Sequence, residues 1–579
     1  MRISKHAFLA AFLAPVFAFG GVLAYQQPES PSAHATKTLV TAKRQMVVAA
    51  NPLAAEAGRE ILRKGGSAVD AAIATQMVLN VVEPQSSGIG GGLFLLAYNA
   101  ASKTLINIDG RETAPAGATP DLFLDADGKP LPFKAAAESG RSVGVPGVLA
   151  ALKLAHDKYG KLPWAELFNP AIEIARAGFA VSPRLAKMIA EAGPGNFVGE
   201  ARADFFDAEG RPWPSGYKLT NPKLAETFAA IAREGPDAFY KGAIAKDIAV
   251  AVQTDPRGAG TLTAEDLANY RAKLRDPVCV LYRAFEVCGA APPSSGAIAV
   301  GQALILIEPF DLGATPLAAK AVHLIVEAER LAFADRGRYL ADPDFVAPPA
   351  GLLDRKYLEE RRALIDPARA SDGVTAGTPP NTRQGAFGDD GTRENIGTSH
   401  VSIVDAEGNA VSMTTSIEQA FGSRIMVRGF LLNNELTDFS FRPVDDEGRP
   451  IANRVEPGKR PRSSMDPTII FSEGRELRYL LGSPGGPGII LFNLKAIIAM
   501  LDWKLDPQAA AALPTFGSTG GKVLLERGPG FDSLAKALRE RGHDVEPFDF
   551  ASGLAIIAVT PEGLQGGADP RREGAAVGD

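Results

Sequence analysis

In Asn395-Ile396-Gly397-Thr398-Ser399-His400-Val401-Ser402-Ile403-Val404-Asp405, a polar segment turns into an alternating β-strand, and a threonine stands at the change, directly after a glycine. A threonine hydroxyl is a poor nucleophile without a base. The free α-amino group of the same residue can be that base once the preceding peptide bond is cut. We therefore expect Gly397–Thr398 to be a scissile bond, with a threonine that only begins a strand as the alternative.

The strand is followed by a turn cluster at residues 405–409 and by a second strand-like run at residues 410–417. If this hairpin folds symmetrically about Glu407, Thr398 lies opposite Ser416, and cross-strand partners are roughly 5 Å apart. The sequence thus predicts a second hydroxyl beside the candidate nucleophile.

Four further segments extend the pattern around Gly397-Thr398. They are DGRETAP at 109–115, LLNNELTDFS at 431–440, KRPRSSM at 459–465 and GSPGG at 482–486. Together the five segments resemble, in their order, the γ-glutamyltransferase family of N-terminal-nucleophile hydrolases. The resemblance covers nearly the whole mature chain and implies an α+β fold, a four-layer αββα sandwich.

The family resemblance also implies the reaction. It is the cleavage of γ-glutamyl amide bonds, as in glutathione, through a threonyl acyl-enzyme that passes to water or to an amino acid or dipeptide. Thr398 would attack, with its own α-amine as base, and Ser416 would orient its hydroxyl. Backbone N–H groups at Gly485 and Gly486 would stabilise the oxyanion, since glycine lets a substrate approach the backbone closely.

A second group of side chains would hold the glutamyl zwitterion. The residues that the resemblance points to are Arg111, Glu418, Glu435, Asp438, Ser463 and Ser464. Arg111 and the two serines would bind the α-carboxylate, and the acidic side chains would lie against the α-ammonium. Glu418 stands where family members usually have asparagine, and Ser416 stands where threonine is usual.

The N-terminus has the features of a signal peptide, with Arg2 and Lys5, an apolar run over residues 7–19, and Val22-Leu23-Ala24 as a cleavage site. We predict a signal peptide at 1–24, a large subunit at 25–397 and a small catalytic subunit at 398–579, all from one precursor. Export to the periplasm or the medium follows, with no stable membrane span after removal of the signal. An uncleaved anchor is the alternative, although the apolar run is short for a span.

Composition narrows the class of protein further. With 46% hydrophobic and 22% charged residues, the 579-residue chain can bury a large core. The net charge of −6 offers no basic surface, so we expect no nucleic-acid partner. The six histidines are scattered without metal-ligand spacing, and we expect no catalytic metal and no cofactor.

The two cysteines flank a predicted two-residue turn at Arg283-Ala284. That turn would place Cys279 directly opposite Cys288, and in an oxidising compartment the two could pair. Two small apolar residues in a hairpin are the alternative.

Two other functions compete with the γ-glutamyl enzyme. One is a glutaryl-type β-lactam (cephalosporin) acylase on the same fold, whose acyl group carries a carboxylate but no amine. The other is an uncleaved, inactive relative that serves as a binding protein. The retention of Thr398, Arg111 and the Gly485-Gly486 pair argues against the inactive relative.

Overall fold

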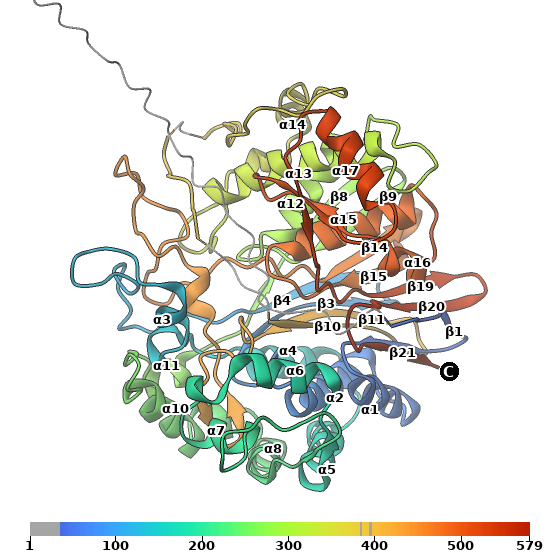
Figure 1. Ribbon diagram of the computed structural model, residues 1–579. Coiled ribbons are helices and arrows are strands. Elements are labelled where there is room, and N and C mark those ends of the chain that lie inside the picture. Colours follow the sequence, from blue (N-terminus) through green and yellow to red (C-terminus); the bar gives the residue numbers. More distant parts are fainter. Residues whose placement is uncertain (1–34, 383–384, 393–396) are drawn as a thin grey trace, which may run out of the picture.

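A computed structural model describes residues 35–382, 385–392 and 397–579 (Figure 1). The predicted signal peptide, the first residues of the predicted large subunit and residues 393–396 lie outside the described residues. No helix in the described ranges is both long and apolar enough to cross a membrane.

Two seven-stranded sheets lie face to face between layers of helices, which confirms the α+β, αββα prediction (Figure 1). The first sheet runs in the order β21 (Ala575–Gly578), β2 (Met46–Ala49), β10 (Thr398–Val404), β11 (Ala410–Ser416), β3 (Gly92–Asn99), β4 (Thr104–Gly110) and β7 (Lys273–Arg275). The second runs in the order β1 (Val40–Ala42), β20 (Gly563–Ala568), β19 (Ala555–Thr560), β15 (Glu476–Gly482), β14 (Thr468–Ser472), β9 (Phe285–Gly289) and β8 (Val278–Tyr282).

Helices cover the outer face of each sheet. Those packed on or beside the first sheet are α1 (Pro52–Arg63), α2 (Ala68–Val82), α4 (Val148–Tyr159), α5 (Asn169–Ala177) and α8 (Pro222–Glu234). Those on the second are α12 (Gly296–Ile307), α13 (Ala319–Tyr339), α15 (Gly488–Leu501) and α16 (Pro507–Ala512). Helix α2 follows the N-cap Ser67, which forms a capping box with Asp70.

Smaller elements complete the layers. The remaining helices are α3 (Phe133–Ala137), α6 (Pro183–Ala192), α7 (Gly199–Phe205), α9 (Asp237–Tyr240), α10 (Ala243–Gln253), α11 (Ala264–Asn269), α14 (Arg355–Arg362) and α17 (Phe531–Glu540). Three small sheets pair β5 (Phe179–Ala180) with β6 (Lys218–Leu219), β12 (Met426–Val427) with β13 (Phe430–Leu431), and β16 (Phe516–Gly517) with β17 (Val523–Glu526) and β18 (Val545–Phe548).

The β10–β11 hairpin has the predicted register, because Thr398 pairs with Ser416 and Val404 pairs with Ala410. Side chains alternate between the two faces of a strand. Val401 packs with the helices outside the sheet, while the Ser402 hydroxyl bonds to the second sheet at 3.0 Å from the carbonyl of Ala555. Thr398 lies four residues before Ser402 on the same strand, so its side chain is on the same face, the one toward the second sheet.

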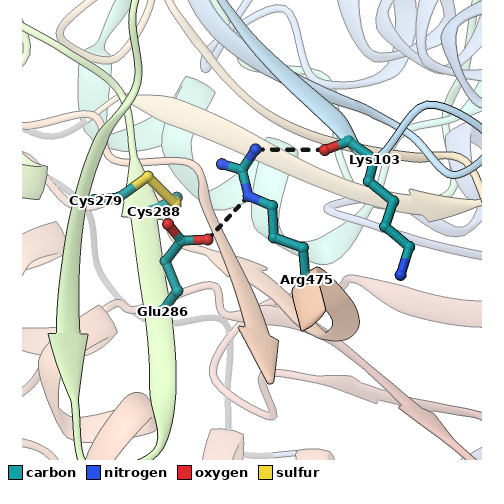
Figure 2. The surroundings of a disulfide bond; sticks show 5 residues. All are labelled: Lys103, Cys279, Glu286, Cys288 and Arg475. Atoms are coloured by element: carbon teal, nitrogen blue, oxygen red, sulfur yellow. Dashed lines mark hydrogen bonds and ion pairs between the residues drawn. A yellow bond between two sulfur atoms is a disulfide. The ribbon is translucent and has the colours of Figure 1, made fainter. Parts of the chain in front are cut away.

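Cys279 and Cys288 lie directly opposite each other in the edge hairpin of the second sheet, at the predicted register. Their sulfur atoms are bonded at 2.05 Å (Figure 2). Beside them Glu286 accepts a hydrogen bond from Arg475 at 3.0 Å, and Arg475 also donates to the Lys103 carbonyl at 3.3 Å. Lys103 lies in the β3–β4 turn, so this contact joins the two sheets near the disulfide.

Candidate active site

Thr398 is the first residue of β10, and its hydroxyl belongs to a chain of hydrogen bonds between hydroxyl and backbone groups. Its hydroxyl donates to Ser416 Oγ at 3.2 Å, and Ser416 in turn donates to the Gly397 carbonyl at 2.7 Å. The N–H of Glu418 also donates to Ser416 Oγ, at 2.8 Å. Because a hydroxyl has one proton and two lone pairs, these three bonds use all the hydrogen-bonding capacity of Ser416 and fix its direction.

Gly397 is required by space. A Cβ at this position would lie 2.2 Å from the carbonyl oxygen of Glu418 and 2.6 Å from the carbonyl carbon of Gln419. Any larger residue would push this chain segment away from the end of β11. The glycine therefore keeps the 397–398 peptide bond beside Ser416.

The Ser483-Pro484-Gly485-Gly486 loop follows β15 and precedes α15, on the side of the sheet that Thr398 faces. Gly482, the last residue of β15, packs on the His400 ring so closely that a Cβ would lie 2.2 Å from it. His400 has the same parity as Thr398 and is buried, and burial lowers its pKa to about 3. The imidazole is therefore neutral. Gly485 and Gly486 have φ values of 141° and 53°, which favour glycine.

Arg111 directly follows β4 and is fully buried. Its guanidinium pairs with the carboxylates of Glu435 and Asp438, which lie on one 3-10 turn, Glu435–Asp438. It also donates to the backbone carbonyls of Pro461, at 3.1 Å, and Arg462, at 3.0 Å. The segments 109–115, 431–440 and 459–465 thus meet at this one side chain.

The cluster around Arg111 has more acidic than basic groups. Glu112 lies 3.8 Å from the Arg111 guanidinium, and neither of its carboxyl oxygens has a hydrogen-bond partner among the described residues. Burial raises the pKa of Glu112 well above its ordinary value, and the neighbouring charge of Glu435 adds to this effect. Burial also raises the pKa of Glu435, against the opposing charge of Arg111. The cluster is therefore a place where an added cation would be stabilised.

The other three predicted substrate-binding residues flank this cluster. Ser463 and Ser464 follow directly after the two carbonyls that bind Arg111, and Ser464 Oγ accepts from Arg336 at 2.6 Å. The carboxylate of Glu418 accepts from the side chain of Asn434, the residue before Glu435. Glu418 therefore reaches the cluster through Asn434.

Sequence reasoning missed several contacts of the site. The residues concerned are Glu112, Arg336, Asn434 and Arg572, the last of which donates to the Thr398 carbonyl at 3.3 Å. Glu112 and Asn434 stand inside segments that the sequence singles out, so a search for acidic and amide residues beside Arg111 and Glu435 could have found them. Arg336 and Arg572 stand outside those segments, and only the fold brings them to the site.

Two histidines that are far apart in the sequence meet in the structure. His323 Nδ1 and His543 Nε2 are 2.7 Å apart, and Glu327 lies nearby. Glu327 is hydrogen bonded to Arg330 at 2.8 Å and also to Ser371. The side chains of this cluster are therefore hydrogen bonded to one another. The cluster joins α13, which carries His323 and Glu327, to the turn after α17, which carries His543.

Two stacked sheets between helical layers, with a threonine at the start of a central strand, are the arrangement of the N-terminal-nucleophile hydrolases. The sequence profile of the Gamma-glutamyltranspeptidase family matches residues 54–579. The chain therefore belongs to the γ-glutamyltranspeptidase family.

Individual relatives are similar over almost the whole chain. A glutathione hydrolase proenzyme from Bacillus subtilis (strain 168) is 37% identical over 593 residues, covering 100% of this chain and 99% of the relative. The Acylase ACY 1 proenzyme from Pseudomonas sp. (strain V22) is 36% identical, covering 93% of this chain and 94% of the relative. The crystal structure of cephalosporin acylase from Bacillus halodurans matches with a TM-score of 0.83 at 29% identity, covering 96% of this chain and 99% of that chain.

Proposed function

We propose that the chain is a precursor that cuts itself at Gly397–Thr398 and then acts as a γ-glutamyl hydrolase and transpeptidase. One observation carries the proposal. The Ser416 hydroxyl lies between the Thr398 hydroxyl, at 3.2 Å, and the Gly397 carbonyl oxygen, at 2.7 Å. A nucleophile and the carbonyl that it would attack thus share one hydrogen-bonding partner.

In the proposed self-cleavage, Thr398 Oγ attacks the Gly397 carbonyl carbon, and the Ser416 O–H stabilises the charge that develops on the carbonyl oxygen. The Thr398 hydroxyl proton passes to the α-nitrogen as the C–N bond to Thr398 breaks, which leaves Gly397 as an ester on Thr398 Oγ and a free α-amine on Thr398. Water hydrolyses the ester. The products are a chain that ends in the Gly397 carboxylate and a chain that begins with the Thr398 amine.

The same threonine then serves the γ-glutamyl substrate. Its α-amine takes the hydroxyl proton while Oγ attacks the γ-carbonyl, and the amide nitrogen of the substrate leaves with a proton. The glutamyl ester formed on Thr398 passes to water in hydrolysis or to an acceptor amine in transpeptidation. Backbone N–H groups of Gly485 and Gly486 are our candidates for the oxyanion site.

Recognition of the glutamyl zwitterion follows from the charges around Arg111. A substrate α-carboxylate takes the place of a carboxylate on the guanidinium, and the displaced Glu435 or Asp438 then accepts the α-ammonium. Such an exchange adds one negative and one positive charge, so the buried cluster keeps its balance. Both oxygens of Glu112 and the second oxygen of Glu435 have no hydrogen-bond partner within the described ranges, and they offer further acceptors for the ammonium.

A glutaryl acylase remains the second candidate, because two of the relatives above carry acylase names. A glutaryl group would bring a carboxylate to the cluster without an ammonium. Glu435 and Asp438 already outnumber Arg111 there, and burial with the charge of Glu435 raises the pKa of Glu112, so a further carboxylate would lack a cationic partner. The charge of the cluster favours the γ-glutamyl substrate.

Subunits and compartment complete the proposal. The large subunit would be residues 25–397 and the small catalytic subunit residues 398–579, after loss of the signal at 1–24. The partners would then be the two subunits, glutathione or a related compound, and an acceptor. The export signal in the sequence supports a periplasmic or extracellular location.

The decisive experiment is a denaturing gel of the purified protein with N-terminal sequencing, followed by a γ-glutamyl anilide assay. Two chains are expected, one beginning at Thr398, together with release of the anilide. A fully active protein that migrates only as one uncut chain would refute the mechanism.

A further inference from the structure

The nucleophile strand has an open side that the neighbouring strand does not cover. Strand β2 pairs with β10 only from Val401 to Val404, so the first residues of β10 have a strand partner on the β11 side alone. An uncovered strand end leaves backbone groups that must bond elsewhere. Thr398 is such a residue, and it carries the proposed reaction.

The Arg572 side chain lies on this uncovered side of β10, beside Thr398. It is buried, and it stands just before β21, the strand on the other side of β2. Its guanidinium reaches past the end of β2 and donates to the Thr398 carbonyl at 3.3 Å and to the Ala551 carbonyl at 2.9 Å. This side chain thus supplies a hydrogen bond on the side of β10 where no strand pairs with Thr398. It also joins the start of β10 to the segment before β19.

The same side chain touches the neighbours of the glycine loop. A Cβ on Gly553 would lie 2.8 Å from Arg572 Cδ and 2.7 Å from Pro484 Cγ, so Gly553 is packed between the two. Pro484 directly precedes Gly485 and Gly486. Arg572 therefore links Thr398 to the loop that is our oxyanion candidate, through a single glycine.

The turn that carries Arg572 is itself held in place. The Lys37 ammonium donates to three of its backbone carbonyls, those of Asp569, Arg572 and Gly574, at 2.8, 2.7 and 2.6 Å. Asp569 accepts from the Ser552 hydroxyl at 2.7 Å. The guanidinium is therefore supported by a rigid turn rather than by a free chain end.

We propose that Arg572 is a positioning residue for the nucleophile, which holds Thr398 in register with the Ser483–Gly486 loop once the bond to Gly397 is cut. The inference rests on the proposed function, because it takes Thr398 as the nucleophile. Cleavage removes the covalent anchor on the amino side of Thr398, and its carbonyl contact then gains importance. A displacement of about 1 Å at a reacting group can cost about a hundredfold in rate.

The charge of Arg572 supplies a readout that packing alone would not change. The carbonyl oxygen and α-nitrogen of one residue are roughly 3 Å apart, so the guanidinium lies within about 7 Å of the new amine. A cation at that distance favours the unprotonated amine, which is the base. The other titratable groups near this position are Lys37, whose charge interacts with Asp569, Glu573 and Glu83, together with His400 on β10 and Glu418, whose N–H bonds to Ser416. They are unchanged when Arg572 alone is replaced.

The test compares Arg572→Met and Arg572→Lys with Arg362→Met. Arg362 is a matched control, because its guanidinium also donates to two backbone carbonyls, those of Ile305 and Leu306, at 3.0 and 3.1 Å. In cleaved Arg572→Met, kcat on a γ-glutamyl anilide should fall about ten- to a hundredfold with KM within about twofold of the unmodified enzyme. The acid limb of kcat/KM should move up the pH scale by about 0.5 to 1.

Arg572→Lys keeps the cation, so its acid limb should stay near that of the unmodified enzyme while kcat recovers in part. Arg362→Met should change neither quantity. An Arg572→Met enzyme with unaltered kcat and an unmoved acid limb would overturn the inference.

If Arg572→Met is not cut, its folding can be compared in the uncut background. A Thr398→Ala/Arg572→Met precursor that melts like Thr398→Ala supports positioning, and one that melts well below Thr398→Ala/Arg362→Met assigns Arg572 to folding and refutes the inference. If the proposed function itself is wrong, a different result is expected, because the Thr398→Ala variant will then be active or will cut itself. An uncut, inactive Thr398→Ala beside a normal Arg572→Met would refute this inference alone.

Discussion

The nucleophile region and the substrate cluster are built in opposite ways. Around Thr398 the side-chain contacts are short in sequence and neutral, with Ser416 only 18 residues away, and Arg572 adds one cationic contact to the backbone carbonyl from 174 residues away. Around Arg111 the contacts are charged, buried and distant, with Glu435 and Asp438 separated from it by 324 and 327 residues. One hairpin aligns the two hydroxyls of the first region, whereas the second region is assembled by the whole fold.

This difference corresponds to two functions of the molecule, self-cleavage with catalysis in the first region and substrate recognition in the second. A hairpin can align a hydroxyl and a peptide carbonyl before any substrate is present, which is what a self-cleaving precursor requires. Buried ion pairs contribute little net stability compared with apolar residues, but breaking one is costly. The Arg111 cluster is therefore suited to discriminate between substrates. Changes in the first region should affect cleavage and catalysis together, and changes in the second should affect recognition alone.

The largest effect is expected from Thr398. Thr398→Ala should remain a single chain and lose activity by at least about 10,000-fold, because both the hydroxyl and the new amine are required. Thr398→Ser is the matched control, since it keeps both groups and should still be cut. Mass spectrometry measures cleavage, and the anilide assay measures activity. Cleavage of the Thr398→Ala chain would show that Thr398 is not the nucleophile of self-cleavage.

The next effect separates the two regions. Arg111→Lys keeps the charge but loses the planar fork that binds two carboxylates and two carbonyls, so kcat/KM should fall about 100- to 1,000-fold. Self-cleavage should proceed as in the unmodified chain. The control is Arg257→Lys, which alters another two-point contact, with Asp255 at 3.0 and 2.6 Å, in the helical layer. Uncut Arg111→Lys would show that the regions are not independent.

The same contrast explains what the sequence could predict. The Thr398–Ser416 pairing follows from the two-residue period of a strand and a symmetric turn, and the Cys279–Cys288 register follows from a two-residue turn. Both depend only on local geometry.

The Arg111 cluster was accessible only through family resemblance. No periodicity places an arginine after β4 against a turn more than 300 residues later. Glu112 shows the limit clearly, since it stands beside Arg111 in the sequence, but its burial without a hydrogen-bond partner among the described residues is a property of the fold. Arg572 lies in no recognised segment, and its contact with Thr398 depends on where β2 ends.

A smaller effect tests the charge of the cluster. Replacing a γ-glutamyl by a glutaryl group removes the ammonium and leaves buried carboxylates unpaired, which should cost about 2–4 kcal/mol. The cleaved enzyme should therefore prefer the γ-glutamyl anilide over the matched glutaryl anilide by roughly thirty- to a thousandfold in kcat/KM. Equal rates, or a preference for the glutaryl anilide, would contradict the proposed function and support the acylase function instead.

The smallest effect is a pH dependence, and its sign distinguishes the regions. An α-amine base works only when unprotonated, so kcat/KM of the cleaved enzyme should fall as pH falls through about 7 to 8. His400 cannot cause this limb, because burial lowers its pKa to about 3. Glu112 is not the proposed base, and burial raises its pKa. Glu112→Gln should therefore leave the acid limb in place. An acid limb near pH 4, or one that disappears in Glu112→Gln, would assign the base to a carboxylate and move part of the chemistry from the hairpin to the cluster.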